Sequence, residues 1–193
     1  MKNYSKLIHS SIKIKKQLFK LENKVDQAVK MMTETISDGG KVMICGNGGS
    51  AADAQHLAAE FLIRLRPKVN RKAIPVLSLA METSSLTACG NDFSFSDIFS
   101  RPFNAFAKNK DLLIVISTSG NSKNILKVLK DAKKKNIKSI SLLGSNGGKA
   151  KGMADLDIIV PSKITARIQE CHIMLGHFIF EQTENNLLAK NFI

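Results

Sequence analysis

The sequence predicts an α/β protein in which five parallel strands form one sheet flanked by helices, with a long helix at the N-terminus. Short apolar segments of strand length alternate along the chain with longer segments of helical periodicity. Strands that are apolar throughout are typical of a parallel sheet buried on both faces. The chain has 193 residues, of which 44% are hydrophobic. This is enough for one sizeable core, and we expect right-handed crossovers between the strands.

The N-terminal segment has the pattern of one continuous helix over residues 3–37, which Asp38-Gly39-Gly40 ends. We interpret residues 1–40 as a helical extension and residues 41–193 as the main domain. The apolar stripe of the extension needs a partner, which is either its own core or a second subunit. The stripe consists of Leu7, Ile8, Ile12, Ile14, Leu18, Leu21, Val25, Val29, Met32 and Ile36.

The remaining elements follow in the order expected of strand–helix units. Turns rich in glycine or hydroxyl side chains precede the first two of these predicted helices, and Pro67 follows the first. The strands are predicted at residues 41–45, 74–79, 112–117, 139–143 and 156–160, and the helices at residues 51–66, 123–135 and 164–188.

The net charge of +13 raises the question of a nucleic-acid partner. We interpret it as a solvated lysine surface, because the lysines are scattered over predicted helix faces. With no Trp and one Tyr, the chain is also poorly suited to stacking on single strands. We therefore expect no nucleic-acid partner. We expect no membrane segment either, because no apolar run approaches the length of a span.

Three scattered cysteines and the lack of a signal peptide predict a cytoplasmic protein with reduced thiols. Cys45, Cys89 and Cys171 are too few for a disulfide framework and have no CxxC spacing. The N-terminus lacks a continuous apolar region before a cleavage site.

Two turns at strand ends have the chemistry of anion sites. In the first, Gly46-Asn47-Gly48-Gly49-Ser50, glycines allow close approach of a ligand to a helix N-terminus, which Ser50 is expected to cap. The second, Ser117-Thr118-Ser119-Gly120-Asn121-Ser122, offers hydroxyls and amides to phosphate oxygens. Each turn alone also fits an ordinary strand-to-helix connection. Neither matches GxGxxG or GxxxxGK[ST], so the pair favours a small phosphorylated ligand over a nucleotide.

Two helices carry groups suited to acid–base or metal chemistry. His56 and Glu60 are four residues apart and share a helix face, which fits a metal pair, an acid–base pair or, as spacing alone favours, a surface ion pair. On the C-terminal helix, His177 is eight residues from Gln169 and four from Glu181. Spacing does not decide between these two pairings.

Three further polar residues have an open interpretation. His172 fits a structural histidine as well as a functional one, and Glu170 lies in the same helix cluster. Asp92 follows the second strand in a predicted loop, where it suits either sugar hydroxyls or the cap of the next helix.

Four segments together resemble the phosphoheptose isomerases of the SIS (sugar isomerase) domain superfamily. The resemblance is collinear from about residue 41 to residue 188. It implies a flavodoxin-like three-layer sandwich, and an enzyme that converts sedoheptulose 7-phosphate to D-glycero-D-manno-heptose 7-phosphate. This reaction begins the synthesis of heptose for bacterial lipopolysaccharide, capsule or other surface glycans. The segments are GNGGSAADAQHLAAEF, CGNDFSFSDIFSRP, ISTSGNSKNILK and RIQECHIMLGH.

The resemblance also implies roles for individual residues. Glu60 and His177 match the proposed acid–base pair of the family, and it is this match that selects Gln169 and His177 within the C-terminal helix. One zinc ion per subunit is implied on His56, Glu60, Gln169 and His177. The implied substrate contacts are Asn47, Gly48, Gly49, Ser50, Glu60, Asn91, Asp92, Ser117, Thr118, Ser119, Ser122 and Gln169.

The same resemblance implies a homotetramer with sites between subunits. In such an assembly, Glu60 and His177 of one site can belong to different chains. It leaves open whether these two residues bind metal, move protons or do both. A non-catalytic SIS module that binds a protein partner, such as the replication initiator, is the alternative. The acid–base set counts against it, since a binding module has no need of one.

Overall fold

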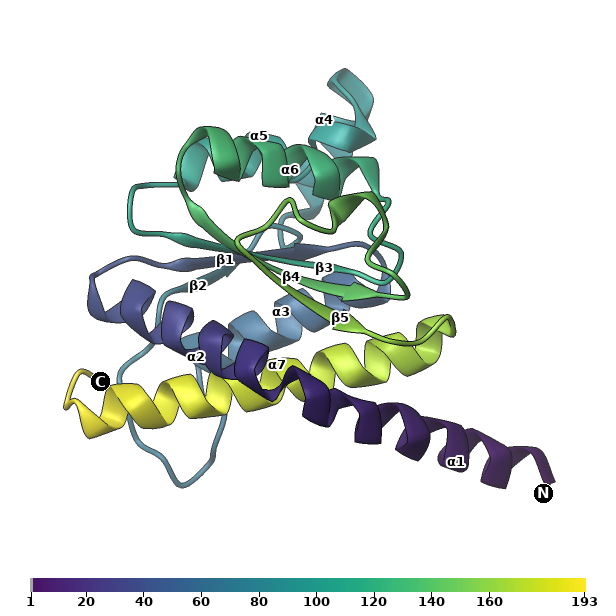
Figure 1. Cartoon of the computed structure of the whole chain (residues 1–193). Coiled ribbons are helices and arrows are strands. Elements are labelled where there is room, and N and C mark those ends of the chain that lie inside the picture. Colours follow the sequence, from purple (N-terminus) through teal and green to yellow (C-terminus); the bar gives the residue numbers. More distant parts are fainter. Residues whose placement is uncertain (1) are drawn as a thin grey trace.

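The computed structural model describes residues 2–193, and it consists of a parallel sheet between two layers of helices (Figure 1). The five strands lie in the order β2-β1-β3-β4-β5, and every neighbouring pair is parallel. This confirms the predicted fold class. The strands are β1 (Val42–Gly46), β2 (Val76–Ser78), β3 (Leu112–Ser117), β4 (Lys138–Gly144) and β5 (Leu156–Val160).

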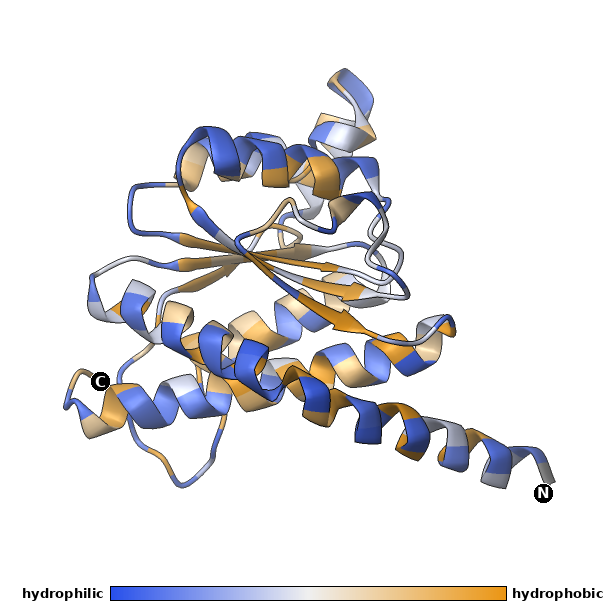
Figure 2. Ribbon diagram, viewed as in Figure 1, coloured by the Kyte–Doolittle hydropathy of each residue, from blue (hydrophilic) through white to orange (hydrophobic). Residues whose placement is uncertain are grey.

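Both faces of the sheet are buried, which explains why its central strands are apolar throughout. Every residue of β1 and β3 is buried. Alternate side chains enter two separate cores, as Ile44 and Met43 do from β1. Figure 2 shows the apolar strands enclosed by helices whose outer surfaces are polar. One core is covered by α2 (Glu22–Ser37), α3 (Gly49–Leu62) and α7 (Thr165–Ala189), and the other by α5 (Ser100–Phe106) and α6 (Lys123–Lys134).

The N-terminal segment is helical over the predicted residues 3–37, but a 3-10 turn interrupts the α-helix. It consists of α1 (Lys2–Gln17), a 3-10 turn η1 (Leu18–Leu21) and α2. The break lets α2 bury Met32 and Ile36 against the sheet and α7, whereas α1 extends away from the domain (Figure 1). Because α2 shares the core of the sheet, it belongs structurally to the domain; the division at residue 40 stays a prediction.

The segment between β2 and β3 contains helices that the sequence analysis did not predict. They are α4 (Thr83–Asp92), the 3-10 turn η2 (Phe95–Asp97) and α5. Asp92 therefore lies at the end of a helix and not in a loop. It does not cap the next helical turn, because the Ser94 hydroxyl does so by accepting from the Ser96 amide at 3.1 Å.

The helix after β1 also differs from its prediction at both ends. It begins at Gly49 instead of residue 51 and ends at Leu62 instead of residue 66. The segment that follows turns back on the helix: the Ile74 amide donates to the Phe61 carbonyl at 3.0 Å. Tertiary hydrogen bonds of this kind end a helix without any local sequence signal.

Candidate functional site

The two predicted anion-binding turns lie side by side at the carboxyl ends of β1 and β3. These strands are neighbours, with Gly46 opposite Ile116. Asn47 in the first turn and Asn124 at the start of α6 exchange two side-chain hydrogen bonds of 2.9 and 2.8 Å. In open parallel sheets, this edge is where ligands bind.

In the first turn, backbone hydrogen bonds begin the helix, whereas we expected the Ser50 side chain to cap it. Gly48 adopts φ +56°, and its carbonyl accepts from the amides of Ala51 and Ala52. Ser50 lies inside α3 and is buried, and no side chain caps the helix. The prediction of a Ser50 cap is therefore wrong. A Cβ atom on Gly49 would lie 2.6 Å from Nε2 of Gln169, so the glycine brings this turn against α7.

In the second turn, part of the hydroxyl set builds the turn itself. The Ser117 hydroxyl is buried and accepts from the Gly120 amide at 3.1 Å, and the Ser119 hydroxyl accepts from the Asn121 amide at 3.2 Å. Ser122 immediately precedes α6 and makes no side-chain cap. Gly120 has φ +62°, and a Cβ atom there would lie 1.9 Å from the Gly147 carbonyl oxygen. The turn is thus held in a shape that only glycine permits at its centre.

Beside the second turn lies a polar cavity of about 350 Å³. Thr118 and Ser119 line it on one side, and Lys163 and Thr165 line it from the start of α7. The sequence analysis assigned no role to Lys163, which belongs to no recognisable motif. A phosphate group would find hydroxyls and one cation at this place. The other lining residues are Asn121, Ser145, Asn146 and Ile168.

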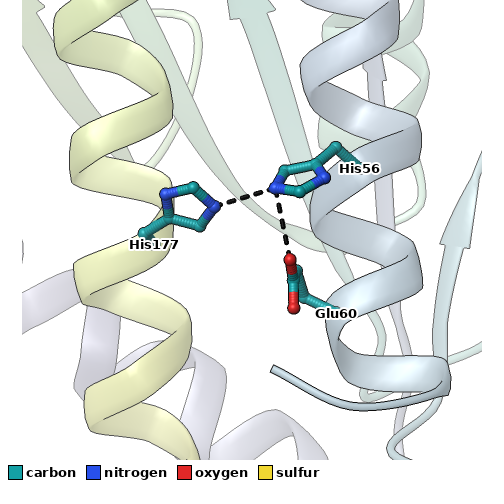
Figure 3. Close-up of side chains that lie close together, drawn as sticks. All are labelled: His56, Glu60 and His177. Atoms are coloured by element: carbon teal, nitrogen blue, oxygen red, sulfur yellow. Dashed lines mark hydrogen bonds and ion pairs between the residues drawn. The ribbon is translucent and has the colours of Figure 1, made fainter. Parts of the chain in front are cut away.

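Three side chains from α3 and α7 converge on one point (Figure 3). Nε2 of His56 lies 2.9 Å from Nε2 of His177 and 3.2 Å from Oε1 of Glu60. One ligand atom from each of the three residues falls within 4.8 Å of the others. Two imidazoles and a carboxylate are ligands that zinc accepts, and they are also groups that can exchange protons. His56 and Glu60 therefore form more than an isolated surface pair.

The close approach of α3 and α7 makes this convergence possible within one chain. A Cβ atom on Gly176 would lie 2.6 Å from Cδ1 of Leu57, so a glycine stands where the two helices are closest. One turn further along α3, the rings of Phe61 and Phe180 pack with their centroids 4.4 Å apart. Ligand atoms of Glu60 and His177 come within 4.8 Å of each other in one chain, and the contribution of a second subunit to the site stays a prediction.

The other polar residues of the C-terminal helix have different partners. Glu181 pairs with Arg66 at 3.7 Å, so the alternative pairing of His177 with Glu181 is not formed. Glu170 bonds to Ser11 and Arg167. Gln169 lies about two turns before His177, with its amide against Gly49.

His172 is the structural histidine that the sequence analysis allowed for. It is fully buried, and its Nε2 lies 2.9 Å from the Leu143 carbonyl, to which it donates. Burial lowers the pKa of His172 to about 4, although the hydrogen bond to Leu143 acts in the opposite direction. The imidazole is therefore neutral and unavailable to the site at neutral pH.

Asp53 lies on the same face of α3 as His56, and the sequence analysis assigned it no role. One of its carboxylate oxygens is buried without a hydrogen-bond partner. Desolvation raises the pKa of Asp53, while His56 and His177 lower it, which places its charge near both histidines. Its spacing of three residues before His56 was the signal that could have marked it. By contrast, Asn91 and Asp92 are exposed at the end of α4, where the Asn91 amide donates to the Asp92 carboxylate at 2.7 Å.

Comparisons with known proteins identify the family of the chain. The model of the SIS domain family matches residues 7–144. The chain is 53% identical over 156 residues to a phosphoheptose isomerase of Chlorobaculum parvum, covering 80% of this chain and 75% of that protein. Its structure is similar to those of two phosphoheptose isomerases, both at 95% coverage of this chain. The isomerase of Neisseria gonorrhoeae is 37% identical, with a TM-score of 0.88, and the match covers 98% of its chain. The isomerase of Francisella tularensis is 33% identical, with a TM-score of 0.91, and the match covers 97% of its chain.

Proposed function

This chain belongs to the SIS domain family and, within it, to the phosphoheptose isomerases, and we propose that the α3–α7 site performs their reaction. The substrate is sedoheptulose 7-phosphate, and the product is D-glycero-D-manno-heptose 7-phosphate, with which heptose biosynthesis begins. The observation that carries the assignment to this site is the convergence of His56, Glu60 and His177 at the contact of α7 with α3, the helix that follows the first turn.

The reaction moves a proton between adjacent carbons, and the site has two groups suited to this. A base removes a proton from C1 of the ketose, which gives an enediol, and a proton returned to C2 gives the aldose. The hydroxyl proton moves from O1 to O2 in the same process. We assign these transfers to Glu60 and His177, whose side chains both point toward His56 at the α3–α7 contact (Figure 3).

The phosphate end of the substrate is assigned to the second turn. Thr118 and Ser119 line the polar cavity there, and Lys163 adds a positive charge that compensates the phosphate. Gly120 allows the conformation of the turn, and the Ser117 hydroxyl stabilises it by accepting a hydrogen bond from the Gly120 amide. Ser122, the first turn at Asn47–Ser50, Gln169 and the exposed Asn91 and Asp92 complete the proposed set of substrate contacts.

The converging ligand atoms also fit one zinc ion, because two imidazoles and a carboxylate form a common ligand set of catalytic zinc. His56, Glu60 and His177 would hold it, with Gln169 as the proposed fourth ligand. Bound there, zinc would polarise the carbonyl and stabilise negative charge on the enediolate oxygens. Asp53, three residues before His56 on α3, would add a second negative charge near the histidine ligands.

A homotetramer is the proposed assembly, supported by apolar side chains that the single chain leaves in water. Phe19 is 79% exposed, and Leu7 and Ile12 of α1 are also exposed. They continue into an apolar groove that Met174 and Phe178 of α7 line. A second copy that covered this groove would bury the side chains.

We also propose a cytoplasmic location, where the sugar phosphates of central metabolism occur. All three cysteines are free and buried, as suits a reducing compartment. No helix within residues 2–193 is long and apolar enough to span a membrane.

The decisive experiment is to mix the purified protein with sedoheptulose 7-phosphate and follow the aldose by NMR. We expect conversion, and its rate should depend on zinc. No conversion with or without added zinc would overturn the assignment. It would favour the non-catalytic module, although such a module would have no need of the His56–Glu60–His177 group.

A further inference from the structure

A buried ion pair connects the two helices that carry the proposed acid–base residues. Glu184 lies on α7, about two turns after His177, and its side chain is completely buried. Both carboxylate oxygens are paired: one with Nε of Arg71, and the other with Nε of Arg66 at 2.7 Å. The Arg71 side chain is 1% exposed, whereas that of Arg66 is 29% exposed. Arg71 is therefore the arginine that the fold encloses.

The same guanidinium binds the end of α3 at the residue that the mechanism uses. Nη2 of Arg71 donates to the backbone carbonyl of Glu60 at 2.8 Å, and Nη1 donates to the carbonyl of Phe61 at 2.9 Å. The last carbonyls of a helix have no partner within the helix, and a cation beside them is favourable. Arg71 also stands over the Phe61 ring, 5.6 Å from its centroid.

We propose that Arg71 and Glu184 are positioning residues, which fix the Glu60 backbone on α3 relative to His177 on α7. The inference rests on the proposed function of the site. Neither side chain is among the residues that line the cavity beside the second turn or among the converging ligand atoms. Their role is to hold the two helices in place. Arg71 binds both the Glu60 carbonyl on α3 and the carboxylate of Glu184, which lies seven residues after His177 on α7. Proton transfer is sensitive to such placement, since a displacement of about 1 Å costs about a hundredfold in rate.

Arg66 provides the matched control that makes the proposal testable. It pairs with the same Glu184 carboxylate but donates to neither Glu60 nor Phe61 in the structure. Asp111 serves as a second control, because it is a buried carboxylate at the opposite end of the sheet. It accepts from the backbone amides of Lys41 and Lys108 at 3.0 and 2.7 Å. Asp111→Asn therefore weakens the fold without touching α3 or α7.

The experiment measures kcat and KM for sedoheptulose 7-phosphate in Arg71→Met, Arg71→Lys, Arg66→Met and Asp111→Asn, each well below its Tm. We expect Arg71→Met to lower kcat by about ten- to hundredfold, with KM within about threefold of the original protein. Arg71→Lys should recover part of kcat, because an ammonium keeps the charge but cannot reach both carbonyls and the carboxylate. Arg66→Met and Asp111→Asn should keep kcat within about threefold.

Two results would overturn the proposal. One is that both Arg71 variants keep kcat within about twofold. The other is that Asp111→Asn, at an equal loss of Tm, lowers kcat as much as they do. If Arg71→Met does not fold, Arg71→Lys decides by the same criteria.

A spectroscopic measurement separates the failure of this proposal from failure of the proposed function. Imidazole NMR signals of His56 and His177, assigned with His56→Gln and His177→Gln, should shift in Arg71→Lys and stay in place in Arg66→Met. If the original protein does not isomerise the sugar, the proposed function fails, and these signals still decide whether Arg71 positions α3. Unchanged signals in Arg71→Lys would overturn the positioning role.

Discussion

His56 and His177 meet across the contact of α3 and α7 with their Nε2 atoms 2.9 Å apart. Two neutral imidazoles can share one proton at this distance, but two protonated ones would repel each other. The Glu60 carboxylate beside them, 3.2 Å from His56, provides the opposite charge. The arrangement is suited either to moving a proton or to holding a cation, and both uses can be tested.

The first prediction concerns the carboxylate. Glu60→Gln keeps the shape of the side chain but removes its ability to accept a carbon-bound proton. We expect turnover of sedoheptulose 7-phosphate to fall by about a thousandfold or more, within the range for loss of a general base. Binding of the sugar phosphate, measured by calorimetry, should stay within about tenfold.

Glu34→Gln is the control for this substitution, because Glu34 is a half-exposed carboxylate of α2 that forms only long ion pairs of 3.9 Å. It should leave turnover unchanged. If Glu60→Gln retained a tenth or more of the activity, Glu60 would not be the base of the reaction.

The second prediction concerns the metal. His56→Asn removes one of the three converging ligand atoms, and we expect the affinity for zinc to fall by at least about tenfold. The measurement is a zinc titration of metal-free protein, read by calorimetry, so it does not depend on activity.

His9→Asn is the matched control, since His9 lies exposed on α1 and its Nδ1 bonds to the carbonyl of Ser5. It should bind zinc like the original protein. Equal affinities for His56→Asn and His9→Asn would contradict a metal site at the α3–α7 contact.

The parallel sheet could be predicted from sequence because strands buried on both faces have uninterrupted apolar sequences. The ends of the helices were harder to predict where hydrogen bonds to distant residues determine them. The bond from the Ile74 amide to the Phe61 carbonyl joins residues thirteen positions apart, and no local pattern announces it. In the same way, α4 has a weakly apolar sequence with one buried residue, Cys89, so periodicity gave no sign of it.

The candidate site divides in a similar manner. His56 and Glu60 were visible as a pair because four residues bring side chains to one helix face. His177 could not be joined to them by spacing, since a contact between α3 and α7 depends on how both helices pack on the sheet. The resemblance to a family supplied that link, and the structure places the atoms together. Lys163 and Arg71 stayed hidden, because a lysine or arginine in a basic chain carries no signal of its own.

The third prediction tests the shape of the second turn. Gly120 has φ +62°, and a Cβ atom there would meet the Gly147 carbonyl oxygen at 1.9 Å. Gly120→Ala should therefore cost backbone strain and a clash with backbone that cannot move aside. Together they should lower the free energy of unfolding by about 2 to 4 kcal/mol. KM for the sugar phosphate should rise as well, because the proposed phosphate site is displaced.

Gly39→Ala separates the two effects, since Gly39 has φ +79° but no atom lies within 4 Å of the place that its Cβ would take. It should show the strain alone, about 1 kcal/mol, without a change in KM. Equal losses of stability for the two variants, measured by urea unfolding, would show that the turn yields to the added methyl group.

The fourth prediction concerns acid stability, and its sign follows from His172. The pKa of this buried imidazole falls to about 4 in the folded protein, from an ordinary value of about 6.5. Between these values, the unfolded chain binds a proton that the folded chain does not. Stability is therefore lost as pH falls from about 6.5 toward about 4, by at most about 3 kcal/mol from this residue.

His172→Gln removes the titrating group while leaving an amide that can donate to the Leu143 carbonyl. The variant is expected to lose less stability than the original protein between pH 6.5 and pH 5, whatever its stability at neutral pH. Urea unfolding at several pH values gives both slopes. Parallel curves for the original protein and His172→Gln would mean that His172 takes up its proton without unfolding, and that the packing around α7 relaxes to admit the charge.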